Sequence, residues 1–311
     1  MSYPIEQKLV IAVSSSTLFD LSESHSVFVE QGPNAYKHFQ EQHLDKVLDK
    51  GVAFPFIRRF LQINQRFPDK QPVEVVLLSR NSAATGKRVF RSIKHYGLDI
   101  SRAAFMEGNS PYEYIPAFNA SLFLSANGGD VQKAIAAGYP AGVMLPSTTI
   151  TDDDNDELRV AFDFDGVIAD DEAESVFKDE NLSGFHQHEV AKANTPHQPG
   201  PLADLFKKLS LLQQLEDKEV EKNRDYQRIL RTAIVTARNA PSHERVITTL
   251  EHWGVSANEV FFLGGMAKGR ILSRLKPHMF FDDQRGHLTS EAGDIPMVHI
   301  PFGIANRLIT E

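Results

Sequence analysis

The stretch Val160-Ala161-Phe162-Asp163-Phe164-Asp165-Gly166-Val167 decides the fold, because a short apolar run ends there in two carboxylates and a glycine. Such a run is typical of a buried strand in a parallel sheet. Side chains alternate along an extended chain, so Asp163 and Asp165 point to the same side, while Gly166 lets the backbone turn sharply. Ligands of open parallel sheets bind at the carboxyl ends of the strands. We therefore expect both acids at a ligand site, although a pair of this kind, taken in isolation, is more often a solvated strand end.

Similar apolar runs lie on both sides of this stretch and alternate with helical patterns. Continuous apolar strands that alternate with helices are typical of a parallel sheet covered on both faces. The predicted fold class is therefore α/β, built on a doubly wound parallel sheet. The strands are expected at residues 9–13, 73–78, 121–126, 159–164, 232–237, 259–264, 278–283 and 296–300.

The chain also repeats itself. Ser26-Val27-Phe28 recurs as Ser175-Val176-Phe177, at an offset of 149 residues, and Arg88-Val89 recurs as Arg245-Val246, at an offset of 157. The change of offset predicts an insertion in the polar stretch 214–231, which we expect to be a loop. An ordered series of matches at nearly constant spacing indicates two related halves.

The boundary between the halves is expected in residues 147–157, which are polar, acidic and without periodicity. Residues 1–150 would form the first half and residues 151–311 the second. Each half would carry a helical excursion after its first strand, at 20–70 and at about 169–231. The second excursion would be a small helical cap.

Three further polar elements follow strands of the second half. Thr236 and Ala237 end an apolar run just before a helical pattern, where a hydroxyl and backbone amides can face an anion. Lys268 follows an apolar run and a glycine pair, so one ammonium group can reach a phosphate. Asp282-Asp283 end another apolar run and can complete an oxygen-rich metal site. Taken singly, these residues are typical of a helix cap, a solvated lysine and an acidic turn.

The first half lacks the charged members of this set. At the two offsets, Asp163 corresponds to Ser14, Asp165 to Ser16, Lys268 to Pro111, and Asp282-Asp283 to Ser125-Ala126. The apolar and turn framework persists without the charges, so the fold does not require them. We therefore expect the second half to be catalytic and the first half to be degenerate, without the catalytic acids.

Composition narrows the function classes. The 311 residues include no cysteine, which excludes disulfides and thiolate metal sites and suits a reducing compartment. The net charge of −8, without a long Lys/Arg block, argues against nucleic-acid binding. The apolar run near the N-terminus is too short for a membrane span and lacks the pattern of a signal peptide. We expect a cytoplasmic protein with a small-molecule ligand, no nucleic-acid partner and no membrane association, and the sequence leaves open whether it forms a homo-oligomer.

The ordered motifs resemble a known superfamily. DFDGV at 163–167, then Thr236, Lys268 and FFDD at 280–283, is similar to the four-motif pattern of haloacid dehalogenase-like phosphatases. The phrases RVAFDFDGV, VTARNAP, LEHWGV, FFLGGMAKG and PHMFFDDQ more closely resemble bacterial members of the cytosolic 5′-nucleotidase type I family. The likeness runs over essentially the whole chain.

The resemblance implies Mg²⁺-dependent hydrolysis of nucleoside 5′-monophosphates, AMP-like or deoxynucleotides, to nucleoside and phosphate through a phospho-aspartyl intermediate. Asp163 would be the nucleophile, and Asp165 would protonate the leaving group and then activate water. The phosphoryl oxygens would be held by Thr236, Ala237 and Lys268. The Mg²⁺ ligands implied are Asp163, Asp165 through its carbonyl, Asp282 and Asp283, with the choice between the last two left open.

Substrate selection is expected in the cap and in nearby loops. The candidates are Phe177, Phe185, His186, Arg238 and, if the two halves face each other, Asn81. The aromatic candidates are equally typical of the core of a short helix. The shared motifs address phosphate alone, so a sugar phosphate or another small phosphomonoester stays an alternative substrate. A second alternative is a non-catalytic nucleotide sensor.

Overall fold

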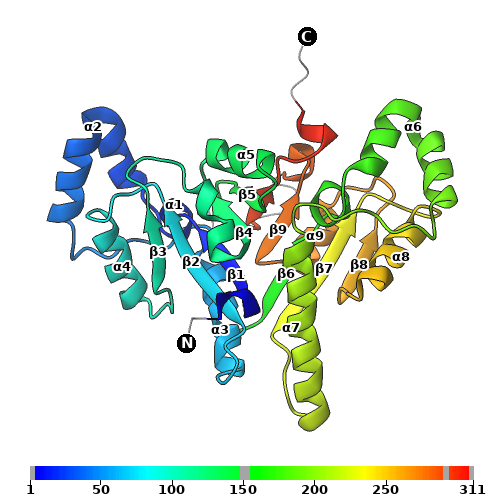
Figure 1. The fold of residues 1–311 in the computed structure, drawn as a ribbon, viewed down its shortest axis with the longest axis horizontal. Helices are drawn as coiled ribbons and strands as arrows, with labels where there is room; N and C mark the ends of the chain where they lie inside the picture. Colours follow the sequence, from blue (N-terminus) through cyan, green and yellow to red (C-terminus); the bar gives the residue numbers. More distant parts are fainter. Residues whose placement is uncertain (1–3, 148–154, 290–293, 308–311) are drawn as a thin grey trace. The chain divides into compact units, whose positions relative to one another are not determined.

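The computed structural model describes residues 4–147, 155–289 and 294–307 (Figure 1). The chain has an α/β fold in which most strand pairs are parallel, as predicted. It divides into two compact units. Their described residues are 4–139 with 146–147 in the first unit, and 140–145 with 155–289 and 294–307 in the second. Most of the predicted linker, residues 148–154, lies outside the described residues.

The first unit has four parallel strands in the order β3-β2-β1-β4. Strand β1 lies between β2 and β4 and is fully buried, which explains its continuous apolar sequence. The strands are β1 (Leu9–Val13), β2 (Val73–Ser79), β3 (Arg102–Phe105) and β4 (Ala120–Ser125). The helices are α1 (Ser15–Leu18), α2 (Ser22–Gln42), α3 (Phe54–Arg66), α4 (Gly86–His95) and α5 (Gly128–Ala136), with the short turns η1 (Ile5–Gln7), η2 (Tyr112–Tyr114) and η3 (Pro116–Phe118).

The second unit has its strands in the order β5-β10-β9-β6-β7-β8. The pair of β5 and β10 is antiparallel, whereas the other pairs are parallel. The strands are β5 (Ala141–Met144), β6 (Leu158–Phe162), β7 (Leu230–Thr236), β8 (Glu259–Phe262), β9 (Met279–Asp282) and β10 (Met297–His299). The helices are α6 (Glu172–Ala191), α7 (Ala203–Lys222), α8 (His243–Trp253) and α9 (Gly269–Leu275), with the turns η4 (Phe164–Ile168), η5 (Arg285–His287) and η7 (Ile304–Asn306).

All eight apolar runs chosen from the sequence form strands, but two further strands were missed. Strand β3 is short and half-buried, and its sequence Arg-Ala-Ala-Phe lacks a β-branched residue. Strand β5 contains Gly142, which weakens a strand pattern. A side chain at Gly142 would lie 2.2 Å from Val298 of β10, so the glycine permits close strand packing. Because β5 pairs with β10, it belongs to the second unit, although the sequence boundary assigned it to residues 1–150.

The prediction of a loop at 214–231 was wrong for residues 214–222, which are helical. Helix α7 continues to Lys222, whereas the corresponding helix α3 of the first unit ends at Arg66. The polar residues of this stretch are mostly Gln, Glu and Lys, which are good helix formers. Buried Gln213 and Glu216 add contacts on one side of the helix. The extra residues therefore lengthen a helix instead of forming only a loop.

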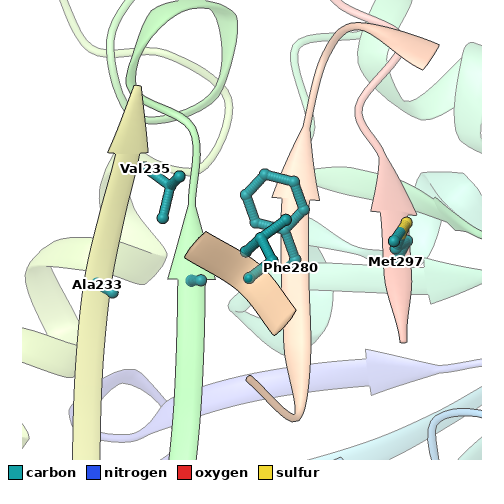
Figure 2. Packing of buried hydrophobic residues seen from close by; sticks show 6 residues of the cluster. Ala233, Val235, Phe280 and Met297 are labelled. Atoms are coloured by element: carbon teal, nitrogen blue, oxygen red, sulfur yellow. The ribbon is translucent and has the colours of Figure 1, made fainter. Parts of the chain in front are cut away.

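The core of the second unit lies along its sheet. Ala233, Val235, Phe280 and Met297 come from three strands and pack in one buried cluster (Figure 2). On the opposite face of the sheet, the rings of Phe162 and Phe281 stack at a centroid distance of 5.1 Å. This packing fixes β6, β7 and β9 side by side, so their carboxyl ends meet at one edge.

The helical excursions of the two units bend at corresponding residues. Helix α2 bends at Gly32, with φ 84°, and helix α6 bends at Asn181, with φ 63° (Figure 1). Both residues have a left-handed φ with ψ near 180°, a region that glycine enters easily and other residues enter only at a cost. The two bends are 149 residues apart, the offset of the sequence repeat. In the part of the chain that the structure describes, no helix has the length and apolar composition needed to cross a bilayer.

Candidate active site

Asp163 follows β6 directly and starts the turn η4. Its amide donates to the carbonyl of Phe281 at 2.8 Å, and its Oδ1 accepts a hydrogen bond from the amide of Phe164 at 2.7 Å. The turn needs Gly166, which has φ 70°, because a Cβ there would lie 2.6 Å from Cγ of Asp283. The glycine therefore brings the β6 and β9 ends together.

Lys268 bridges two of the acids. Its Nζ lies 2.6 Å from Oδ2 of Asp163 and 2.7 Å from Oδ2 of Asp282. All three side chains are buried, so little water screens these ion pairs. Burial alone would lower the pKa of Lys268, but the ion pairs with Asp163 and Asp282 outweigh burial and raise it. Lys268 therefore keeps its ammonium form. The structure thus joins residues that the sequence placed on three separate loops.

The acids outnumber the nearby lysine. Burial, with repulsion from Asp163 and Asp282, raises the pKa of Asp283 to about 9. Burial also raises the pKa of Asp163 to about 7, although Lys268 opposes the shift. The Oδ1 atom of Asp283 is buried and has no hydrogen-bond partner among the described residues. The cluster is therefore short of positive charge.

This cluster has the properties of a cation site. Donor atoms of Asp163, Asp282 and His287 lie within 4.8 Å of one another. Asp283 adds the unpartnered oxygen, and carboxylate oxygens are the ligands that hard divalent cations prefer. The donor set therefore fits a divalent metal ion.

A second group of possible donors is already occupied by protein cations. Donor atoms of Asp170, Glu172 and His197 also lie within 4.8 Å of one another. However, Glu172 pairs with Arg245 at 2.8 Å and also with Lys192. Asp163 and Asp282 are also paired with a lysine, but among the described residues this second group has no buried oxygen without a partner to match Oδ1 of Asp283, so we assign no metal to it.

Thr236 and Ala237 lie at the same strand edge as Asp163. Strand β7 pairs with β6 in parallel, with Ile234 opposite Phe162, so both strands end beside each other. Thr236 is buried and its Oγ1 accepts a hydrogen bond from the amide of Arg238 at 3.3 Å, whereas Ala237 is exposed. Both residues therefore lie at the strand edge where Asp163 lies, and their contact with an anion stays a prediction.

Arg238 holds Asp165. Its Nε donates to Oδ2 at 2.8 Å and its Nη2 donates to Oδ1 at 2.7 Å. The guanidinium also contacts Glu189. To bind a substrate anion, Arg238 would have to give up one of these protein contacts. Arg238 was a substrate-binding candidate in the sequence, and its contacts in the structure are instead with protein carboxylates.

The other substrate candidates differ in exposure. Phe177 is exposed, while Phe185 is buried with its ring 5.5 Å from Cζ of Arg238. His186 contacts Asn239 at 3.2 Å, in the loop after Thr236. Asn81 lies in the first unit, where it accepts a hydrogen bond from Tyr36. Of this group, Phe177 offers the most free ring surface.

Sequence reasoning missed Glu189, His197 and His287. His287 lies 3.2 Å from both carboxylate oxygens of Asp282. Glu189 and His197 are buried next to Arg238. At the offset of 149 they correspond to Gln40 and Leu48, so the comparison that singled out Asp163 contained the signal for these two as well.

The fold and the site together define an α/β protein with a lysine-bridged cluster of acids at the carboxyl ends of parallel strands. A family model described as 5′-nucleotidase matches residues 1–307, and the chain belongs to this family. The chain is 34% identical over 286 residues to a human protein named cytosolic 5′-nucleotidase 1B. This alignment covers 90% of the chain and 46% of the human protein, so the chain spans about half the length of that relative. No solved structure matches significantly. The family predicted from the motifs is confirmed.

Proposed function

We propose that the chain is a Mg²⁺-dependent 5′-nucleotidase that hydrolyses nucleoside 5′-monophosphates through a phosphorylated Asp163. The observation that carries the proposal is the buried Asp163 carboxylate, with Lys268 Nζ at 2.6 Å and further acids around it. Membership of the 5′-nucleotidase family and the name of the human relative support the substrate class. A haloacid dehalogenase-like mechanism is part of the same proposal.

In the first step, a carboxylate oxygen of Asp163 attacks phosphorus and the bond to the ribose oxygen breaks. Asp165 donates a proton to that departing oxygen. In the second step, Asp165 takes a proton from water, which attacks the phosphoryl group and restores Asp163. Lys268 orients Asp163 and the phosphoryl oxygens, and Thr236 with the Ala237 amide holds the other oxygens.

A bound Mg²⁺ would be held by Asp163, Asp282, Asp283 and the Asp165 carbonyl, and would neutralise charge on the acids and the phosphate. The unpartnered Oδ1 of Asp283 supports this ligand set. The raised pKa values of Asp163 and Asp283 also support it, since a bound divalent cation would favour the ionised form of both acids.

We further propose that the two units are related copies and that only the second is catalytic. Matching bends at Gly32 and Asn181 support this relation. Within the excursion at about 169–231, α6 would act as a cap that excludes water during the reaction, whereas α7 packs on the sheet with Phe206 against Phe162 of β6. A cytoplasmic location and a small-molecule partner stay predictions.

The test is phosphate release from AMP, the other nucleoside monophosphates, their deoxy forms and a set of sugar phosphates, with and without Mg²⁺. Preferential release from nucleotides is expected. Faster release from sugar phosphates would support the alternative substrate class. Nucleotide binding without any release would instead indicate a sensor.

A further inference from the structure

The Asp165 carboxylate is held by the guanidinium of Arg238, a residue without a role in the proposed mechanism. Both of its oxygens accept hydrogen bonds from Arg238, at 2.8 and 2.7 Å. A planar guanidinium that binds both oxygens fixes the direction of a carboxylate as well as its place. Asp165 is partly exposed, so without this contact its side chain would be free to rotate.

Arg238 is itself held by residues of the helical excursion. Its Nη1 pairs with Glu189 of α6, and its Nη2 lies 3.0 Å from Nε2 of His197. The same imidazole lies 3.2 Å from Asp170 through Nδ1 and 3.5 Å from Glu189 through Nε2. Phe185, also on α6, packs its ring on the guanidinium. These contacts leave Arg238 little freedom to move away from Asp165.

The first unit keeps the surrounding framework. Arg88 donates from Nε to the carbonyl of Lys46 at 2.8 Å, and Arg245 donates in the same way to Thr195 at 2.8 Å. The amide of Leu48 donates to Ser92, as the amide of His197 donates to Thr249. Each of these contacts recurs at the offsets of the sequence repeat.

Within that framework, the residues around Arg238 change from charged to neutral. Arg88 contacts Gln40 where Arg245 contacts Glu189. The remaining counterparts are Asn81 for Arg238, Leu48 for His197 and Ser16 for Asp165. Asn81 accepts a hydrogen bond from Tyr36. Tyr36 is the counterpart of Phe185, whose ring packs on Arg238 in the second unit. The charged residues Arg238, Glu189 and His197 therefore have neutral counterparts in the unit that has no carboxylate to position.

We propose that Arg238, anchored by Glu189 and His197, is a positioning residue that fixes Asp165 for proton transfer and connects it to helix α6. The proposal rests on the proposed phosphatase function. Burying ion pairs is costly, and neutral residues serve the same framework in the first unit, so stability alone does not account for them. One contact to Asp165 must open when a carboxylate oxygen turns to the reacting atoms.

The experiment is a rapid-mixing study of Glu189→Gln with p-nitrophenyl phosphate and Mg²⁺. The p-nitrophenolate departs with the electron pair of the broken P–O bond and needs no proton, so phosphorylation of Asp163 stays fast. Hydrolysis of that phosphoryl group still needs Asp165 to take a proton from water. We expect a burst of one p-nitrophenolate per enzyme, followed by turnover about 100-fold slower than wild type.

The matched control is Glu172→Gln. Glu172 lies on the same helix and also pairs with Arg245, but it makes no hydrogen bond or ion pair with Arg238 among the described residues, so turnover of this variant should stay within about twofold of wild type. If Glu189→Gln does not fold, His197→Leu replaces it, because leucine occupies the corresponding buried position in the first unit. The same burst and slow turnover are expected.

A burst and turnover that fall together would mean only loss of folded enzyme and would overturn the positioning role. Wild-type values for both phases would overturn it as well. The proposed function has a separate test in Asp163→Asn, which should give neither burst nor turnover. If Asp163→Asn still turns over, the phospho-aspartyl mechanism fails whatever Glu189→Gln does.

Discussion

The polar side chains that follow β1 and β6 are buried in both units, but those after β1 are neutral and those after β6 are charged. After β1, Oγ of Ser14 and Oγ1 of Thr17 lie 2.5 Å apart, and Ser15 pairs with Ser79 at 2.8 Å. After β6, Asp163 pairs with Lys268 at 2.6 Å. Neutral hydroxyl groups satisfy one another at a small desolvation cost, whereas buried ions require strong pairing to offset theirs.

Features that are present in both units maintain the fold. Both units bend their excursions at left-handed residues and hold a buried arginine, Arg88 or Arg245, against a loop carbonyl. These shared features belong to the framework. The charges found only in the second unit, such as Asp163 and Lys268, belong to the proposed chemistry.

The largest expected difference between the units is in activity. Asp163→Asn should lower phosphate release at least about 10⁴-fold, because the nucleophile is lost while the side-chain shape is kept. Ser14→Ala, at the corresponding position, should leave release unchanged. Steady-state phosphate release from the best nucleotide measures both. A comparable loss in Ser14→Ala would mean that the first unit takes part in the reaction.

The next largest effect is on stability. Lys268→Met leaves Asp163 and Asp282 buried without their shared cation, which should lower the free energy of unfolding by about 3–5 kcal/mol. Pro111→Ala, its counterpart in the first unit, should cost at most about 1 kcal/mol. Urea unfolding followed by circular dichroism covers both units, and fluorescence of Trp253, the single tryptophan, reports on the second unit. Equal losses would place Lys268 in the framework.

A third prediction concerns residues that the units share. A Cβ at Gly51 would lie 2.5 Å from the carbonyl oxygen of Thr17, and a Cβ at Gly200 would lie 2.2 Å from that of Ala169. Gly51→Ala and Gly200→Ala should therefore each destabilise their unit by about 1–3 kcal/mol. Amide hydrogen exchange measures each unit separately. A loss confined to one unit would break the proposed equivalence.

The smallest effect is a pH dependence unique to the second unit. Burial opposes ionisation of Glu189, but hydrogen bonds from His197 and Arg238 lower its pKa from 4.5 to about 2. A carboxylate with a depressed folded pKa stabilises the fold above the unfolded pKa, so this contribution is lost as pH falls from 4.5 towards 2. Gln40, its counterpart, does not titrate.

Wild type should therefore lose about 1 kcal/mol more stability than Glu189→Gln between about pH 5.5 and about pH 3.5. Urea unfolding at the two pH values, followed by Trp253 fluorescence, measures the difference. An identical pH dependence in both proteins would show that the ion pairs of Glu189 do not contribute to stability in this range.

The sequence predicted the parallel sheet well because its strands are buried and almost continuously apolar, as in β1 and β7. Short or glycine-containing strands such as β3 and β5 give no such signal. The cluster of Asp163 and Lys268 was predictable because strand order determines which loops meet. The contact between Arg238 and Asp165 was not, since it depends on side-chain directions after a turn.

Strand β5 has a consequence for how the protein is assembled. Strand β5 comes first in the sequence of its unit, and its residue Met144 pairs with Val298 of β10, the last strand of that unit in the sequence. On the ribosome, this sheet cannot be completed until β10 has been synthesised, because long-range pairings form late. A fragment starting at residue 155 would leave one edge of β10 open to association with other chains, so dissection of the second unit should begin at residue 140.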